Sequence, residues 1–164
     1  MNKLSIEKIN LSAPYKVWET KKENEYNFLS ENGVLYGVGF SEEMEIGGIT
    51  SYQFSFARLN DVHGGFDDNI RKTLMAIISE FFNANDDIMI YICDTADGRE
   101  TFRSRLFLKW FEAAEAQERF VIRTAQAEID GQGFYTAMIV ERSNPHLEQI
   151  IEDFEYTAKM LTEK

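Results

Sequence analysis

Residues 88–99 of this 164-residue chain read Ile88-Met89-Ile90-Tyr91-Ile92-Cys93-Asp94-Thr95-Ala96-Asp97-Gly98-Arg99. An unbroken apolar run ends abruptly at two aspartates and a glycine. Such a run, bounded by turn residues, is typical of a strand that is buried on both faces in the middle of a sheet. A segment carrying Arg103, Arg105 and Lys109 follows it. We therefore expect the fold to be organised around this strand and the helix after it.

The segment before this stretch predicts three strands. Tyr26 and Phe28 share one face of the first strand, and Asn32-Gly33 after it is a strong hairpin signal. The next strand has large side chains on one face and Gly37 and Gly39 on the other. Because glycine has no side chain, we expect another element to approach closely there.

The third strand is predicted from the alternation in residues 50–59. Its inward residues are Tyr52, Phe54 and Phe56, and its outward residues are Ser51, Gln53 and Ser55. Alternation of apolar and polar residues, with one face of the strand exposed to solvent, indicates an antiparallel meander. Residues 42–48 contain three glutamates and end in Gly47-Gly48, and we interpret them as an acidic loop. Residues 1–24 are interpreted as an N-terminal lead-in that contains at most one edge strand, around Tyr15, Val17 and Trp18.

Three helices are predicted from a period of 3.6 residues. The first begins at a cap, Asp67 or Asp68, and buries a stripe formed by Ile70, Leu74, Ile77, Ile78 and Phe81. The second runs from about Gly98 to Ala116, and the third begins at Asn144. Residues 120–129 and 134–140 form a hairpin around Asp130-Gly131. The predicted fold class is α+β, in the order βββαβαββα, with three helices on an antiparallel or mixed sheet of about six strands, and residues 25–164 are expected to form a single domain.

The composition excludes several classes of function. A single cysteine excludes an internal disulfide and a cysteine-cluster metal site. No apolar segment approaches the length that crosses a membrane, and residues 1–11 do not resemble a signal sequence. The net charge of -11 repels nucleic acid overall. We therefore expect a cytoplasmic protein that binds no cofactor and does not contact a membrane.

The candidate site lies where the apolar strand meets concentrated charge, and its residues are Asp94, Asp97, Arg99, Arg103 and Arg105. Arginines early in a helix oppose its macrodipole, which suggests that they serve an anion. In the functional interpretation, free N–H groups and guanidiniums converge on a phosphate or carboxylate. In the structural interpretation, the arginines pair with Asp94, Asp97 or carboxylates of neighbouring loops. The sequence leaves both interpretations open.

Arg103 is the most informative residue of this cluster. On a helical projection it lies within the apolar arc formed by Leu106, Phe107 and Trp110. A guanidinium there must be at least partly buried, so it needs a charged partner. We predict that Arg103 is the least exposed cation of its helix and contacts Asp94, Asp97 or an anion beside them.

No catalytic residue and no metal ligand is assigned from the sequence. Asp94, Asp97 and Glu100 offer oxygen ligands for a cation, but the neighbouring arginines compete for them. His63 or His146 could activate Cys93 as a nucleophile. Cys93 ends the most apolar strand, however, where a cysteine behaves as a small, inert hydrophobe. We therefore predict that Cys93 is buried and structural.

One segment also resembles a known family, on the residues Tyr91-Ile92-Cys93-Asp94, Asp97-Gly98-Arg99, Arg103, Arg105-Leu106-Phe107 and Trp110-Phe111. The chain is similar to a family of small, uncharacterised bacterial proteins, a domain of unknown function. The resemblance covers roughly Tyr26 to the C-terminus. It implies a bacterial, intracellular, stand-alone domain, and it transfers no activity and no catalytic residue.

Two functions follow from these observations. The leading hypothesis is a soluble, non-enzymatic interaction or regulatory domain that binds another protein. A homo-oligomer is one form of such binding. The alternative is a protein that binds a small anion or nucleotide at the start of the second helix. This alternative covers both a binding protein and an enzyme. An uncovered apolar patch or sheet edge would favour the first hypothesis.

Overall fold

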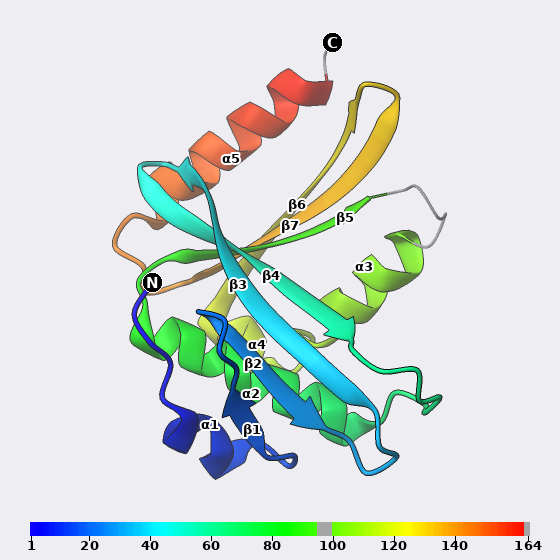
Figure 1. Ribbon diagram of the computed structural model, residues 1–164. Helices are drawn as coiled ribbons and strands as arrows, with labels where there is room; N and C mark the ends of the chain where they lie inside the picture. Colours follow the sequence, from blue (N-terminus) through cyan, green and yellow to red (C-terminus); the bar gives the residue numbers. More distant parts are fainter. Residues whose placement is uncertain (95–99, 163–164) are drawn as a thin grey trace. The chain divides into compact units, whose positions relative to one another are not determined.

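The computed structural model describes the backbone of residues 1–94 and 100–162 and the side chains of residues 1–93 and 105–161. Its elements are α1 (Ile6–Ser12), β1 (Val17–Glu19), β2 (Glu25–Leu29), β3 (Leu35–Ile46), β4 (Ile49–Arg58), α2 (Asp68–Ala84), β5 (Ile88–Asp94), α3 (Glu100–Lys109), α4 (Ala114–Arg119), β6 (Phe120–Ile129), β7 (Gln132–Glu141) and α5 (Leu147–Thr162) (Figure 1). The strands form one sheet in the order β1-β2-β3-β4-β5-β7-β6. The sheet is mixed, because β4 and β5 are parallel whereas β1–β2, β2–β3, β5–β7 and β6–β7 are antiparallel.

The α+β class predicted from the sequence is confirmed, but the predicted counts are too low. The described residues contain seven strands and five helices, where about six strands and three helices were expected. The chain divides into two compact units. Unit 1 comprises Met1–Ser41 and Phe54–Asp86, and unit 2 comprises Glu42–Gln53 and Asp87–Lys164. Strands β3 and β4 contribute residues to both units.

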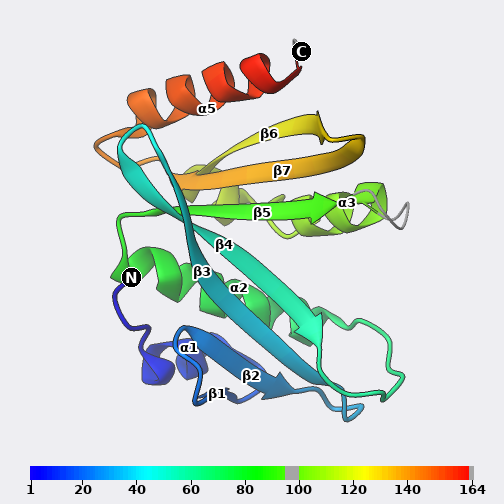
Figure 2. The ribbon, with the colours of Figure 1, turned by 45° about the horizontal axis from the view of Figure 1, so that its top comes forward.

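Unit 1 buries one face of its strands beneath helices. The rings of Tyr15, Phe28, Tyr36 and Phe56 stack in a row, with centroid separations of 6.3, 5.3 and 5.0 Å. Phe40 of β3 stacks on Phe81 of α2 at 4.8 Å. The predicted apolar stripe of α2 is buried throughout, which confirms the helix and its orientation. Both views show α2 behind β3 and β4 on this side of unit 1 (Figures 1 and 2).

The N-terminal segment is an integral part of unit 1 rather than a loose lead-in. Ser5 caps α1 by accepting a hydrogen bond from the Lys8 backbone N–H. The Asn10 side chain then forms two hydrogen bonds with the backbone of Val17, of 2.8 and 2.9 Å. These bonds fix β1, the edge strand anticipated near Trp18, against α1. α1 has only seven residues, and a helix of this length depends on tertiary packing for its stability. The local sequence therefore gives little signal for it.

The predicted acidic loop is wrong. Residues 42–46 belong to β3, and the turn is confined to Gly47 and Gly48, which have φ of 60° and 81°. Ser51, predicted to face outward, is fully buried and donates a hydrogen bond of 2.5 Å to the Met44 carbonyl oxygen. Pairing between the two strands stabilises an extended conformation that the glutamates disfavour on their own.

Unit 2 is organised around β5, as predicted. Ile88 and Ile90 on one face pack with Met138 of β7 and with Ile150 and Phe154 of α5. On the other face, Tyr91 stacks on Phe107 of α3 at 4.2 Å. β5 pairs with β4 on one side and with β7 on the other, so it is an interior strand. Figure 2 shows α5 along one side of β6 and β7.

The second predicted helix is two helices. After α3, the N–H groups of Trp110, Phe111 and Glu112 donate to carbonyl oxygens three residues earlier, at 3.0–3.2 Å. This tighter turn ends α3 and lets both Trp110 and Phe111 pack against Phe107 in the core. The prediction of one continuous helix to Ala116 is therefore wrong.

The C-terminal half follows the sequence more closely. The β6–β7 turn lies at Asp130-Gly131 as predicted, with φ of 52° and 79°. The last helix begins at Leu147 rather than at Asn144, whose side chain and carbonyl oxygen accept hydrogen bonds from His146 and Leu147 just before the helix.

Candidate binding surfaces

The cluster predicted at the start of the second helix falls mainly outside the described side chains. Asp94, Asp97, Arg99 and Arg103 all lie there, and the fifth residue, Arg105, is exposed on α3. The ion-pair and anion-binding interpretations of this cluster both remain predictions. Among the described residues, no group of three His, Cys, Asp or Glu side chains could hold a metal ion.

Cys93 lies in the interior of unit 2. Its side chain is 5% exposed, and its cross-strand neighbour on β7 is Tyr135. Burial raises the pKa of Tyr135, the neighbouring Cys93 raises it further, and the Thr124 hydroxyl lowers it. The thiol is therefore packed in the core, as predicted. His63 and His146 are both exposed.

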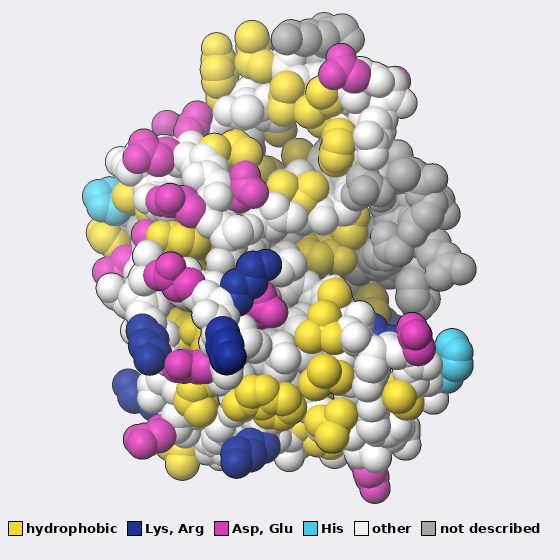
Figure 3. Space-filling view, in the orientation of Figure 1, with side chains coloured by type: hydrophobic (Ala, Val, Ile, Leu, Met, Phe, Trp, Pro, Cys, Tyr) yellow, Lys and Arg dark blue, Asp and Glu magenta, His cyan; other side chains and the backbone are white. Residues whose placement is uncertain are grey.

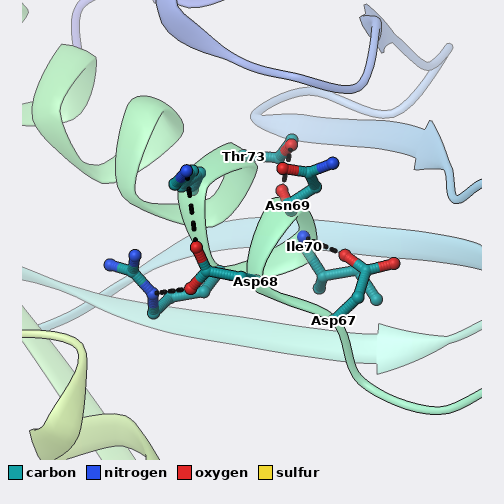
Figure 4. A network of polar contacts seen from close by, with 7 residues as sticks. Asp67, Asp68, Asn69, Ile70 and Thr73 are labelled. Atoms are coloured by element: carbon teal, nitrogen blue, oxygen red, sulfur yellow. Dashed lines mark hydrogen bonds and ion pairs between the residues drawn. The ribbon is translucent and has the colours of Figure 1, made fainter.

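The N-terminus of α2 follows a strand and a glycine-containing loop, an arrangement that can bind anions. In this protein its own carboxylates occupy the position (Figure 4). Asp67 accepts hydrogen bonds from the Ile70 N–H at 2.8 Å and from the Tyr15 hydroxyl at 2.7 Å. Asp68 pairs with Arg71 at 2.8 Å and with Lys72 at 3.4 Å, and the Arg71 hydrogen bond lowers the pKa of Asp68. An external phosphate would meet two negative charges there.

Unit 1 leaves the other side of its strands open. Every residue of unit 1 is described, and its helices pack on the side that carries Phe28 and Tyr36. We call the opposite side the uncovered face, and it consists of Trp18, Asn27, Leu29, Leu35, Gly37, Gly39, Ser55 and Leu59. The strand register places Trp18 beside Asn27, Asn27 beside Gly37, and Leu29 beside Leu35. Trp18, Leu29 and Leu59 are 39%, 49% and 48% exposed, and Figure 3 shows hydrophobic side chains gathered there.

The two glycines of the uncovered face are explained by their neighbours. A Cβ added to Gly37 would lie 2.9 Å from Cδ1 of Leu59, and one added to Gly39 would lie 2.9 Å from Oγ of Ser55. The predicted close approach is therefore made by side chains of β4 and of the residue after it, within the same sheet, and not by a separate element packed on this face. The alternation of large residues and glycines in β3 indicates this face in the sequence, but it does not identify Trp18, Leu29 and Leu59 as its exposed residues.

The charges of unit 1 are nearly balanced. A polar pocket of about 300 Å³ in unit 1 contains the ion pairs Lys3–Glu19 at 3.4 Å and Lys22–Glu25 at 3.9 Å. Unit 1 contains eight Lys and Arg against ten Asp and Glu, a net charge of -2. Unit 2 contains nine against eighteen, a net charge of -9. The acidity of the chain thus belongs mostly to unit 2.

Unit 2 has an apolar pocket of about 120 Å³ beneath α5, which we call the α5 pocket. Small side chains in its wall leave this space unfilled, and they belong to Ala125 and Ala127 of β6 and Ala158 of α5. Leu161 of α5 is 38% exposed and borders this pocket. Figure 3 shows a hollow bordered by hydrophobic side chains beneath α5.

The first half of α5 is held firmly beside this pocket. The Gly47 N–H donates to Oδ2 of Asp153, and Nε2 of Gln149 donates to the Gly47 carbonyl oxygen, both at 2.6 Å. A Cβ on Gly47 would lie only 2.7 Å from the Gln149 carbonyl oxygen, so the turn and the helix are in close contact. The pocket begins beside this anchored region, where Asp153 also lines it, and extends under the second half of α5 to Leu161.

No helix among the described residues is long and apolar enough to cross a membrane.

Comparisons with known proteins give one result. No curated protein and no solved structure matches the chain. Residues 66–156, more than half of the chain, match a family of unknown function (DUF6169). The resemblance inferred from the sequence is confirmed at the level of the family, and the chain belongs to this family of unknown function.

Proposed function

We propose that the protein is a non-enzymatic interaction domain that binds protein through the uncovered face of unit 1. One observation carries this proposal: Trp18, Leu29 and Leu59 come from three separate segments and are exposed together on one side of the strands. Apolar residues scattered singly over a surface are normal, whereas a contiguous apolar patch is typical of an interaction site. Tryptophan is also enriched at the centres of protein interfaces.

The partner that best fits this face is a second copy of the chain. A symmetric dimer brings the same patch of both copies together. Unit 1 carries a net charge of only -2 of the total -11, so contact through this unit meets the least repulsion. The Lys22–Glu25 ion pair places both signs beside this face, because Glu25 lies on the same side of β2 as Asn27 and Leu29, and this is compatible with a self-complementary surface.

The size of the patch predicts a weak dimer. Full burial of one large apolar side chain is worth about 1.5–3 kcal/mol, and these side chains are already about half buried. Three such side chains on each of two copies then contribute roughly 6 kcal/mol in total. The lost translational and rotational freedom opposes this gain. A micromolar dissociation constant requires about 8 kcal/mol, which exceeds even the gross gain, so association is expected only at millimolar protein concentration or above.

Sedimentation equilibrium over a wide concentration range tests the proposal. We expect the wild type to associate and the Leu29→Lys and Leu59→Lys variants to remain monomeric. Leu11→Lys is the matched control, because Leu11 is an exposed leucine of α1 that is not on the uncovered face. It adds the same charge and should associate as the wild type does. A wild type that stays monomeric throughout, or a control that loses association as fully as Leu59→Lys, contradicts the proposal.

The alternative predicted from the sequence is a small-anion or nucleotide site at the start of α3. It depends on Asp94, Asp97, Arg99 and Arg103, and phosphate binding by the intact protein tests it separately. The carboxylates at the N-terminus of α2 give no support to phosphate binding at that other helix end.

A further inference from the structure

We propose that the α5 pocket receives one apolar side chain of a cationic, amphipathic helix from another protein. This surface lies in unit 2, and its use does not depend on the uncovered face of unit 1. The inference rests on two independent properties of the pocket, its apolar walls of limited size and the carboxylates around it.

The size of the pocket selects the kind of group that enters it. Ile90 and Ile92 line one wall, and Phe154 and Ala158 of α5 line another. A volume of about 120 Å³ is close to that of cavities known to bind benzene, and it is well below the volume of a pocket for a drug-sized ligand. The pocket therefore fits one leucine, methionine or phenylalanine side chain.

The charges around the pocket determine which residues of the partner can flank that apolar side chain. Glu45 and Asp153 line the pocket themselves. Residues 42–46 of β3 and residues 147–161 of α5 together contain seven Asp and Glu against one Lys. Arg123 of β6 is already engaged with Glu155 of α5 at 3.5 Å. Figure 3 shows acidic side chains gathered over this part of unit 2.

This field attracts lysine and arginine and repels phosphate groups. A nucleic acid or an anionic lipid surface is therefore disfavoured, whereas a cationic protein segment is steered toward the pocket. Met44 and Met160 are both exposed, Met44 borders the pocket, and methionine adapts readily to partner side chains. An amphipathic helix supplies the required combination, since apolar residues every three or four positions are flanked by charged ones.

The probe is a synthetic peptide of about 18 residues, or five helical turns, with leucines on one face and lysines on the other. Its binding to the full chain is measured by titration calorimetry at low ionic strength. We expect Ala158→Leu, which fills the pocket, to weaken binding by about tenfold or more. Ala127→Leu on the opposite wall should have the same effect, and melting temperatures confirm that both variants fold.

A charge-matched pair of variants tests the carboxylates. Replacing Glu42, Glu43 and Glu45 by Gln should weaken binding by about tenfold at low salt and by less at high salt, where charges are screened. Replacing the exposed Glu112, Glu115 and Glu118 by Gln changes the net charge equally and should leave binding unchanged. Equal effects of the two triple variants would show that only net charge matters and would overturn the proposal.

Three further results would also overturn it. One is the absence of binding by the wild type, and another is wild-type affinity in both pocket-filling variants. The third is equal binding of a control peptide with glutamates in place of the lysines, or of phosphatidylserine vesicles. A peptide with serines in place of the leucines should bind much more weakly, because it offers nothing to the pocket.

Discussion

Removing the Asp67 carboxylate should destabilise unit 1 in two ways at once. The side chain caps α2 by accepting from the Ile70 N–H at 2.8 Å, and it also accepts from the Tyr15 hydroxyl at 2.7 Å. The second bond connects residues that lie 52 positions apart, so it ties the N-terminal segment to the helix. Asp67→Ala removes both bonds, whereas Tyr15→Phe removes only the second.

The expected magnitudes follow from these bonds. Loss of a helix cap costs about 1 kcal/mol, with a range of roughly 0.5–2 kcal/mol. A hydrogen bond to a charged group is worth about 1.5–3 kcal/mol when buried, and partial solvent exposure reduces it to about 1 kcal/mol. Asp67→Ala should therefore cost about 2 kcal/mol, which lowers the melting temperature by roughly 4–8 °C in a chain of this size. Tyr15→Phe should cost about 1 kcal/mol.

Denaturant unfolding of the two single variants and the double variant forms a mutant cycle. We expect a coupling free energy of about 1 kcal/mol between the two side chains. Asp68→Ala is the matched control, because Asp68 is exposed and makes surface ion pairs only, so little change is expected. Strict additivity of the two single variants would refute the connection between the N-terminal segment and α2.

Three other predictions concern different parts of the chain. Cys93 should react slowly with a thiol reagent in the native protein and quickly in denaturant, and fast native labelling would reopen its interpretation as a nucleophile. Arg103→Ala should either lower stability by about 3–5 kcal/mol, as for a broken buried pair, or leave stability nearly unchanged and abolish phosphate binding. If it does neither, both interpretations of that cluster fail. Burial raises the pKa of several tyrosines, so the stability they contribute is complete below pH about 10 and is lost as the pH rises through their folded pKa values. Unfolding midpoints that stay constant above that pH would contradict this prediction for Tyr15, Tyr26, Tyr36, Tyr52 and Tyr135.

Features of the fold with a local cause could be predicted from the sequence. Residues 88–93 form an interior strand because an apolar run makes both faces of the strand hydrophobic, which favours burial on both sides. The α2 stripe, its Asp67 cap and the Asp130-Gly131 turn likewise depend on residues close together in the chain. Each of these predictions is confirmed.

Features with a non-local cause could not be predicted in this way. Residues 42–46 are strand because they pair with β4, although their glutamates suggested a loop. The parallel pairing of β4 with β5 depends on the strand order, which no local pattern specifies. The break after Lys109 arises because Trp110 and Phe111 both pack against Phe107.

The binding surfaces show the same limit. The sequence predicts a site from charged residues that are neighbours in the chain, from Asp94 to Arg105. The uncovered face instead joins Trp18, Leu29 and Leu59, which come from β1, β2 and the segment after β4 and become neighbours only when these segments and β3 pair. Gly37 and Gly39 were the available clue, since they indicated the side on which a neighbour approaches.

The fluorescence of Trp18 tests binding through the uncovered face most directly. The chain has two tryptophans, and Trp110→Phe leaves Trp18 as the only reporter while it keeps an aromatic ring at the buried position 110. Self-association through this face predicts that, as protein concentration rises, Trp18 emission shifts to shorter wavelength and quenching by iodide decreases. Emission and quenching that stay constant from dilute to concentrated protein would contradict the proposed function.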